Sequence, residues 1–242
     1  MLLMMEQKNL KMTRNKSNTC ILIPSRLKST RFPNKPLIDL NGKSMIRTVF
    51  DRCESFGYDT IVVTDSEKIA DEIPLENIVM TDHNYDNGTD RLMRRVVDAV
   101  WCEYDNYINV QGDNPDVTLD IIEAIDNKLD NATVVNAYTI MTNGECKDNN
   151  SVKCIVSDDN INWYTRAEVQ YGFKALGFHG YKKGTSELWS KFKRHKEEKI
   201  EDVEQLRWIQ NGINLKGVFV DFYGVEINEP KDLKKWKFKQ NL

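Results

Sequence analysis

The stretch CILIPSRLKSTRFPNKPL, residues 20–37, decides the fold of this 242-residue chain. Its first four residues, Cys20 to Ile23, form an apolar run that Pro24 ends. Such a short run between polar neighbours is typical of a buried strand in a parallel sheet. A long loop follows, from residue 24 to residue 43, just beyond the carboxyl end of the predicted strand. Open parallel sheets bind their ligands at that end.

This loop carries four cations within ten residues of a chain whose formal net charge is −3. The cations are Arg26, Lys28, Arg31 and Lys35, and the hydroxyl groups of Ser29 and Thr30 lie between them. Guanidinium groups bind phosphate oxygens through paired hydrogen bonds, so the cluster suits a polyphosphate. The pattern is neither the glycine-rich dinucleotide fingerprint nor a Walker loop. For the cation cluster by itself, a solvated charged loop is the alternative.

Outward from the loop, short apolar runs alternate with segments of helical period. Strands are predicted at 20–23, 61–63, 78–80 and 107–110, and helices at 44–56, 67–72, 89–101 and 118–129. This alternation indicates right-handed strand–helix–strand units and a parallel sheet.

After residue 133 the alternation stops. Runs at 133–135, 152–156 and 176–178 follow without intervening helices, which indicates an antiparallel part. The remaining predicted elements are helices at 185–194 and 201–210, a strand at 218–220 and a helix that begins at Pro230. We therefore predict a single α/β domain over residues 19–242, with a Rossmann-like, mostly parallel mixed sheet flanked by helices and a small antiparallel extension. Residues 1–18 are polar without a sustained period, and we expect a disordered tail there.

Composition excludes several classes of protein. Hydrophobic residues make up 40% of the chain and charged residues 29%, which rules out a disordered or fibrous protein. The slight negative charge offers no basic field for nucleic acid, and no apolar run approaches the roughly 18 residues of a membrane span. Five widely spaced cysteines without a C-x-x-C pair argue against a disulfide framework and favour a cytoplasmic location. The histidines, His83, His179 and His195, are too scattered for a metal site, and we interpret them as structural or surface residues.

Four further motifs follow in order: GKSMI at 42–46, NGTDR at 87–91, NVQGDNP at 109–115 and EQLR at 204–207. With the basic loop, they resemble the sugar nucleotidyltransferases, and most closely the 3-deoxy-manno-octulosonate (Kdo) cytidylyltransferase family, over nearly all of residues 19–235. The resemblance implies a nucleotide-diphospho-sugar transferase-like fold. It also implies a reaction of lipopolysaccharide biosynthesis that joins the anomeric hydroxyl of a Kdo-like 2-keto-3-deoxy sugar acid to the α-phosphate of CTP, releasing pyrophosphate.

The resemblance assigns roles to individual residues. The implied catalytic residues are Arg26, Arg31 and Lys35, which hold the triphosphate, and Asp113, which binds the Mg²⁺ cofactor. The implied nucleotide-binding residues are Arg26, Ser29, Arg31, Lys35, Gly88 and Asp90. Those implied to bind the sugar acid are Arg91, Gln111, Glu204 and Gln205. Asp90 has a second interpretation, as an acid that caps or orients the helix it opens. The segment 133–185 is expected to form a homodimer face.

The chain departs from the family at the second metal carboxylate. Aligned on Pro-x-Asp-Leu, Asn228 stands where the family has an aspartate. The metal ligands are therefore predicted as Asp113, Asn228 and a substitute acid, either Glu226 or Glu229. Glu226 is preferred because it lies two residues before Asn228, on the same side of an extended chain.

Three more departures lie toward the sugar side, at Asn114, Asn87 and Tyr85, and they leave the identity of the sugar acid open. Two alternatives for the function follow. One is a CMP-sugar synthetase for another ulosonic or nonulosonic acid, and the other is a catalytically silent sugar-nucleotide-binding protein.

Overall fold

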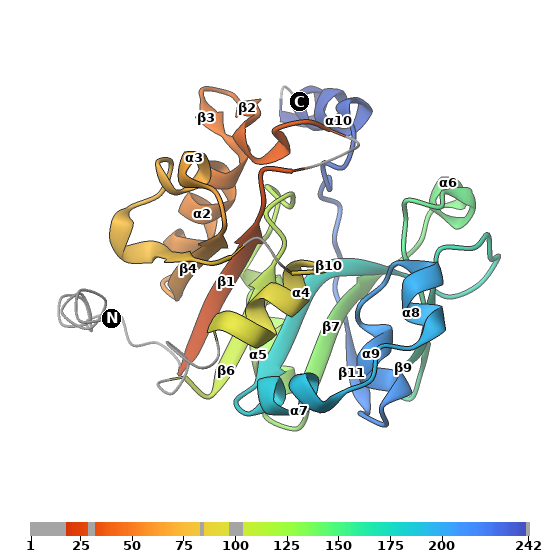
Figure 1. Ribbon diagram of the computed structural model, residues 1–242. Helices are drawn as coiled ribbons and strands as arrows, with labels where there is room; N and C mark the ends of the chain where they lie inside the picture. Colours follow the sequence, from red (N-terminus) through yellow and green to blue (C-terminus); the bar gives the residue numbers. More distant parts are fainter. Residues whose placement is uncertain (1–17, 29–31, 83–84, 97–103, 241–242) are drawn as a thin grey trace.

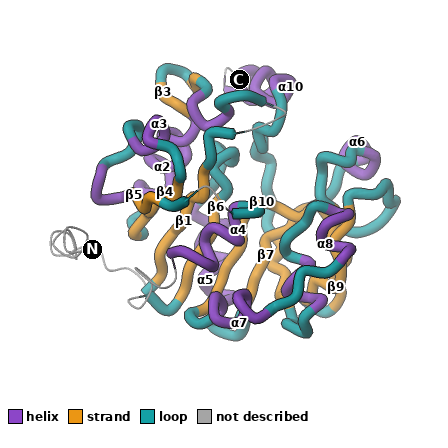
Figure 2. Tube along the Cα trace, in the orientation of Figure 1, coloured by secondary structure: helices purple, strands orange, loops and turns teal. Residues whose placement is uncertain are grey.

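Each predicted apolar run of the parallel part is a strand in the computed structural model, which describes residues 18–28, 32–82, 85–96 and 104–240 (Figures 1 and 2). The strands are β1 (Thr19–Ser25), β2 (Asp39–Leu40), β3 (Lys43–Ser44), β4 (Asp59–Thr64), β5 (Ile78–Met80), β6 (Asn106–Val110), β7 (Val134–Thr139), β8 (Lys153–Ser157), β9 (Asn160–Thr165), β10 (Phe173–Lys182) and β11 (Leu215–Phe219). The predicted tail lies outside the described residues, apart from Asn18.

The helices lie between these strands and after the last one. They are the 3-10 helix η2 (Lys35–Leu37), α2 (Met45–Ser55), α3 (Glu67–Ala70), the 3-10 helix η3 (Leu75–Asn77), α4 (Gly88–Arg91), the π-helix η4 (Leu92–Val96), α5 (Leu119–Leu129), α6 (Asn143–Lys147), α7 (Thr185–Lys191), α8 (Lys196–Glu201), α9 (Leu206–Gln210) and α10 (Pro230–Gln240). The predicted helix 89–101 is therefore α4 followed by η4, and its part beyond residue 96 lies outside the described residues.

Nine of the described strands form one mixed sheet, in the order β5-β4-β1-β6-β10-β7-β11-β9-β8. The strands from β5 to β6 are parallel, with Leu22 of β1 between Ile61 of β4 and Asn109 of β6. β10 is antiparallel to both of its neighbours, β6 and β7, whereas β7 and β11 are parallel. A mixed α/β sheet flanked by helices is therefore confirmed.

The segment 133–185 contributes more than an extension. β8 and β9 form an antiparallel edge, but β7 and β10 lie inside the sheet, and β10 joins its two halves. The prediction that this segment lacks helices is wrong, because α6 lies between β7 and β8. The single helix predicted at 201–210 is also wrong. α8 ends at Glu201 because Asp202 adopts a left-handed conformation with φ 51°, and a new helix, α9, begins after a turn.

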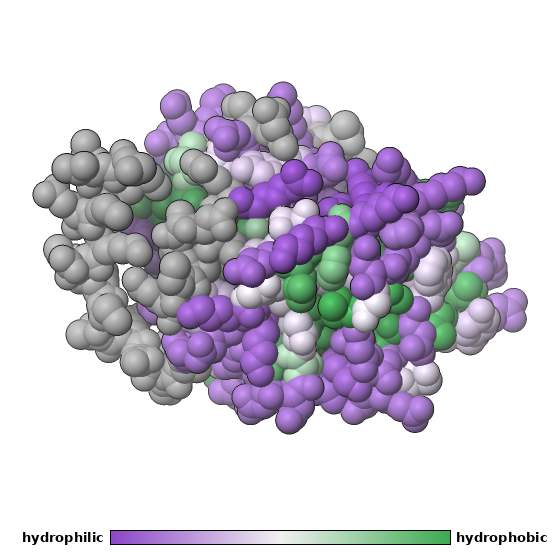
Figure 3. Space-filling view, turned by 60° about the horizontal axis from the view of Figure 1, so that its bottom comes forward, coloured by the Kyte–Doolittle hydropathy of each residue, from purple (hydrophilic) through white to green (hydrophobic). Residues whose placement is uncertain are grey.

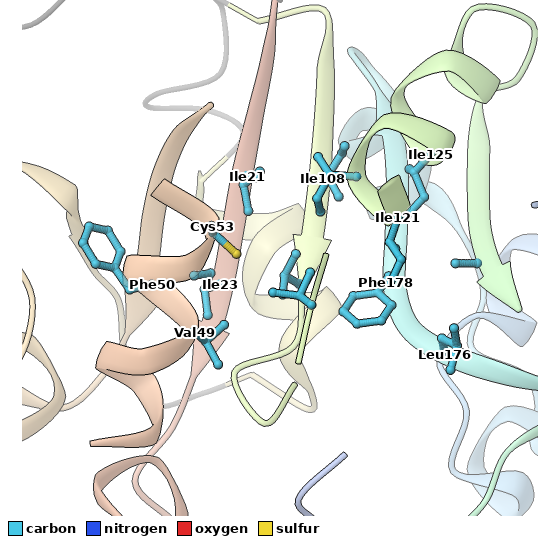
Figure 4. Close-up of a cluster of buried hydrophobic side chains, with 14 of the residues drawn as sticks. Ile21, Ile23, Val49, Phe50, Cys53, Ile108, Ile121, Ile125, Leu176 and Phe178 are labelled. Carbon is cyan, nitrogen blue, oxygen red and sulfur yellow. The ribbon is translucent and has the colours of Figure 1, made fainter. Parts of the chain in front are cut away.

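Alternating side chains of the central strands point to opposite faces of the sheet, as the pleat requires. Ile21 and Ile23 face α2 and α5, and this cluster is drawn in Figure 4. Cys20 and Leu22 face the other layer, in which Trp189 of α7 and residues of α9 are buried. The helices thus cover both faces, and the carboxyl ends of the parallel strands stay open between them.

The surface toward the lower end of the sheet is mainly hydrophilic, with hydrophobic residues gathered near the middle of the view in Figure 3. Within the described ranges, no helix combines the length and the apolar character that a membrane span requires.

Candidate active site

A cleft of about 350 Å³ opens at the carboxyl ends of β1 and β6, where the two parallel strands diverge. Arg26 and Lys28 enter it from the loop after β1, and Lys35 enters from η2. Gln111 and Asp113 enter from the loop after β6. The structure therefore brings three of the four predicted cations and the predicted metal ligand Asp113 to one place. The predicted residues Ser29 and Arg31 lie outside the described residues.

The Lys35 ammonium is the central charge on one side of the cleft. Its Nζ lies 2.6 Å from Asp113 Oδ2 and 3.4 Å from Asn228 Oδ1. Asn114 Nδ2 donates to the other Asp113 oxygen at 3.0 Å, so the carboxylate is fixed at both ends. Side-chain exposures of 17% for Lys35 and 14% for Asp113 shield this pair from water and strengthen it.

Glu226 lines the same cleft, close to Asp113. Burial raises the pKa of Glu226, and the neighbouring Asp113 carboxylate raises it further, while Lys174 and Lys35 oppose the shift. Glu229, by contrast, accepts from Asn150 Nδ2 at 3.1 Å and pairs with Lys231 at 2.9 Å, and it does not line the cleft. Of the two substitute acids that the sequence left open, the geometry favours Glu226.

Two carboxylates and an amide oxygen therefore meet at one edge of the cleft, with an ammonium group held between two of them. Oxygen donors of this kind are the ligands that Mg²⁺ prefers. Asp113, Glu226 and Asn228 thus fit a hard divalent cation in the chemistry of the donor set. Among the described residues, no group of three or more His, Cys, Asp or Glu side chains is arranged to hold a metal by itself.

The second wall begins at α4. Asn87 caps this helix, since its side chain accepts from the Asp90 backbone N–H at 2.8 Å. Gly88 lines the cleft and packs against Pro24, where an added Cβ would lie 3.2 Å from the proline Cγ. Arg91 also lines the cleft, but its guanidinium is held by Asp65. A bare glycine therefore lets the helix start approach the carboxyl end of β1.

Asp90 departs from its predicted nucleotide-binding role. It is buried and does not line the cleft. Its Oδ1 accepts from Trp189 Nε1 at 3.1 Å and from Arg94 Nε at 2.8 Å, and it lies 3.7 Å from Arg207 Nη1. The physical reason is the period of the helix, which turns adjacent residues to different faces. The alternative interpretation of Asp90, as an acid that orients this helix, fits its position better.

The turn between α8 and α9 supplies the rest of this wall. Thr89 Oγ1 donates to Glu204 Oε1 at 3.0 Å and accepts from Gln205 Nε2 at 3.4 Å. Gln205 Nε2 also donates to the Tyr181 hydroxyl at 3.0 Å. Burial raises the pKa of Glu204. Glu204 and Gln205, which were predicted to bind the sugar acid, both line the cleft, although they lie in a turn rather than within a helix.

β10 forms the floor, and the sequence interpretation missed its contribution. His179 lines the cleft, although it was interpreted as structural or surface. Its Nδ1 is buried without a hydrogen-bond partner among the described residues, and burial lowers its pKa to about 3, so the ring is neutral near pH 7. The alternation of Gly177, His179 and Tyr181 along a strand is the signal that could have found it.

A bulge in β10 between Ala175 and His179 shapes this floor. Asn136 Nδ2 donates to the carbonyls of Leu176 and Phe178 at 2.8 Å each, and it holds the bulge open. The Gly177 carbonyl accepts from the Gln111 N–H at 3.1 Å. The Gln111 side chain lies against Gly177 in the space that a Cβ would fill. Both the backbone and the side chain of Gln111 are therefore positioned against Gly177 of β10.

The family model described as "Cytidylyltransferase" matches residues 20–216. The match runs from β1 into the start of β11 and includes all the elements before β11 that line the cleft. The chain belongs to the cytidylyltransferase family. It is therefore a nucleotidyltransferase, as the motifs predicted.

Curated relatives of this cytidylyltransferase cover most of its length. The 3-deoxy-manno-octulosonate cytidylyltransferase of Fusobacterium nucleatum is 33% identical over 213 residues, which are 81% of this chain and 85% of the relative. The 8-amino-3,8-dideoxy-manno-octulosonate cytidylyltransferase of Shewanella halifaxensis is 31% identical over 238 residues, which are 90% of this chain and 96% of the relative.

Solved structures place the fold in the same group. A CMP:2-keto-3-deoxy-manno-octonic acid synthetase complexed with CTP is similar with a TM-score of 0.84 and 28% identity, and the match covers 93% of this chain and 100% of that one. A putative glucose-1-phosphate thymidylyltransferase from Bacillus anthracis, at 12% identity and a TM-score of 0.65, shares the fold alone. The nucleotide-diphospho-sugar transferase-like fold is confirmed.

Proposed function

We propose that this cytidylyltransferase couples CTP to the anomeric hydroxyl of a Kdo-like 2-keto-3-deoxy sugar acid. The observation that carries the proposal is the division of one cleft into two walls. Cations from the β1 loop and η2 form one wall, and the Glu204 carboxyl group and the buried Gln205 amide form the other, with the Gln111 amide against Gly177 of the floor. A triphosphate suits the first wall, and a polyhydroxylated acid suits the second.

In the proposed reaction the sugar oxygen forms a bond to the α-phosphorus of CTP while the bond from that phosphorus to the bridging oxygen of pyrophosphate breaks. The hydroxyl proton is released, and the products are CMP-sugar and pyrophosphate. Transfer of this kind depends mostly on positioning and on neutralised charge. Arg26, Arg31 and Lys35 hold the phosphates, with Ser29 and Gly88 beside them, and Arg91 and Gln111 receive the sugar carboxylate.

Asp113, Glu226 and Asn228 would hold the Mg²⁺ cofactor, which neutralises phosphate charge when bound. The ammonium group of Lys35 supports this assignment, because it now contacts Asp113 and Asn228 as a cation would. With nucleotide present, Lys35 can turn toward a phosphate and release these oxygens. Glu226 supplies the second carboxylate that Asn228 lacks. Its pKa is raised first by burial and then by the neighbouring Asp113 carboxylate, so a divalent cation bound here would be favoured by both acids.

A homodimer formed through residues 133–185 and a cytoplasmic location are part of the proposal. Exposed apolar side chains within that segment, Ile140 at 65% and Tyr171 at 66%, support a protein contact there. Cys20, Cys53, Cys146 and Cys154 are free thiols, which supports a reducing compartment.

The test is pyrophosphate release by the purified chain with CTP and Mg²⁺, offered Kdo, 8-amino-3,8-dideoxy-manno-octulosonate and a nonulosonic acid in parallel. Release that requires an octulosonate supports the proposal, and the ratio between the two octulosonates names the substrate. Release with the nonulosonic acid alone would assign the chain to another CMP-sugar synthetase. CTP binding without release from any acid would make it a silent binding protein.

A further inference from the structure

Two motif charges of this family, Asp90 of NGTDR and Arg207 of EQLR, have no place in the cleft. Both are buried, with side-chain exposures of 4% and 3%. Neither of them lines the cleft. Gln205 does line it, and Thr89 contacts Glu204 and Gln205, which both line it. Burying charges is costly unless each finds partners. Their surroundings therefore show what the two charges do.

The Arg207 guanidinium contacts three neighbouring side chains. Its Nε and Nη2 donate to the two oxygens of Glu198 at 2.9 and 2.6 Å, a bidentate pair. Its Cζ lies 4.0 Å from the centre of the Trp189 ring, in a cation–π contact. Its Nη1 lies 3.7 Å from Asp90, to which Trp189 also donates. One arginine thus joins α4, α7, α8 and α9.

These partners lie on either side of the residues that face the proposed sugar site. Glu198 precedes Glu204 and Gln205 in the chain, and Arg207 follows them, so the bidentate pair closes the turn that carries both. On the opposite segment, Asp90 directly follows Thr89. The front contact between Thr89 and the turn and the rear contact between Asp90 and Arg207 therefore connect the same two segments.

We propose that Asp90, Glu198, Arg207 and Trp189 form a positioning brace that sets the distance between Thr89 and the Glu204–Gln205 turn, and with it the shape of the sugar-acid site. The brace residues touch neither substrate. The inference rests on the proposed function for the identity of the ligand, and on the described contacts for the geometry. Surface ion pairs rarely fix geometry, but a desolvated bidentate pair backed by an indole ring has one arrangement.

The test separates the two substrates. Arg207→Lys keeps the charge but loses the bidentate contact. Trp189→Phe keeps an aromatic ring, although a smaller one, and removes the N–H donor to Asp90. We expect Arg207→Lys to raise the KM for the sugar acid by about tenfold and Trp189→Phe by about threefold, because small displacements of positioned groups have large kinetic effects. The KM for CTP should change less, by no more than about twofold, since the cations lie on the other wall and α4 offers the phosphates only the backbone of Gly88.

The matched control is Arg94→Gln, which removes the other partner of Asp90. Arg94 is 58% exposed, so we expect both KM values to stay at wild-type level. A merely structural role would lower Tm and the fraction of active enzyme, and hence kcat, while leaving both KM values unchanged. Unchanged KM for the sugar acid in Arg207→Lys and Trp189→Phe would therefore overturn the proposal, as would an equal rise in both KM values.

Hydrogen exchange gives a readout that does not need turnover. The brace predicts faster amide exchange confined to residues 88–91 and 202–207 in Trp189→Phe, a variant mild enough to fold. Faster exchange throughout the chain, or none in these segments, would contradict it. If wild type turns over no sugar acid, the proposed function fails, and the exchange experiment still decides on the brace.

Discussion

Gly177→Ala should disturb the site while leaving the fold intact. Gly177 lies in the bulge of β10, and its backbone φ is not in the left-handed region, so alanine meets no backbone strain. The added Cβ would lie 2.7 Å from Gln111 Oε1 and 2.9 Å from Asn114 Nδ2. Both are ends of flexible side chains, which can move at little cost in stability.

The required movement can be worked out from these distances. An ordinary contact begins near 3.4 Å, so the Gln111 oxygen must move by at least about 0.7 Å and the Asn114 nitrogen by about 0.5 Å. Asn114 donates to Asp113, so the change disturbs the predicted metal ligand as well as the sugar-side amide. Misplacement by about 1 Å can lower a rate about a hundredfold. We expect kcat/KM for the sugar acid to fall by about 10- to 100-fold, with the free energy of unfolding changed by less than about 1 kcal/mol.

Gly180→Ala is the matched control in the same strand. There a Cβ would lie 2.5 Å from Ile125 Cγ2 and 3.0 Å from Leu129 Cδ1, inside the core between β10 and α5. Overpacking of this kind costs about 1–3 kcal/mol, so Tm should fall while the KM values stay at wild-type level. Steady-state kinetics and thermal unfolding of both variants provide the comparison. Wild-type kcat/KM in Gly177→Ala would refute the placement of Gln111 against β10.

Other changes address the metal and the buried histidine. Asp113→Asn should abolish Mg²⁺-dependent turnover and leave the circular dichroism spectrum unchanged, and full activity at saturating Mg²⁺ would remove Asp113 from the ligand set. In a Mg²⁺ titration, Glu226→Gln should raise the concentration for half-maximal rate severely while Asn228→Asp changes it little, because the added acid is crowded by Glu226; the opposite order would assign the ligand to position 228. The pKa of His179 is lowered to about 3, so the unfolded state binds the extra proton between that value and about 6.5. The free energy of unfolding should therefore fall as pH decreases through this window, by up to about 1.4 kcal/mol per pH unit. When it is measured by urea unfolding at several pH values, His179→Asn should show a weaker dependence of this free energy on pH.

Much of this fold follows from local pattern. The run at residues 20–23 is apolar on both faces, and only a strand covered by helices on both sides buries it fully. The spacing of Met45, Ile46, Val49 and Phe50 likewise requires a helix with one buried face. By contrast, the run around 176–178 predicts a strand but not its neighbours. Its antiparallel place between β6 and β7 arises from pairings with residues about 40 and 70 positions away.

The residues of the site likewise include some that local sequence pattern predicts and some that only long-range packing places. The cations of the β1 loop and Asp113 after β6 could be predicted as neighbours from sequence, because carboxyl ends of adjacent parallel strands meet. The spacing to Asn228 favoured Glu226 over Glu229 but did not exclude Glu229. That choice depends on which side of the extended segment faces Lys35 and which faces Asn150. The position of Asp90 behind the cleft could not be predicted either. It depends on a helix that is only one turn long and on the contact with Trp189, a residue 99 positions away.

The sequence by itself thus determined most of the strand and helix segments and the chemical type of each wall, because period and residue type act over a few neighbouring residues. Only the tertiary structure decided which motif residue faces the cleft and which lies behind it. Thr89 and Asp90 are adjacent in the chain, yet one contacts Glu204 in the cleft wall and the other approaches Arg207 in the interior. That division comes from packing between α4 and α7–α9, whose residues are about 100 positions apart and have no local signal in common.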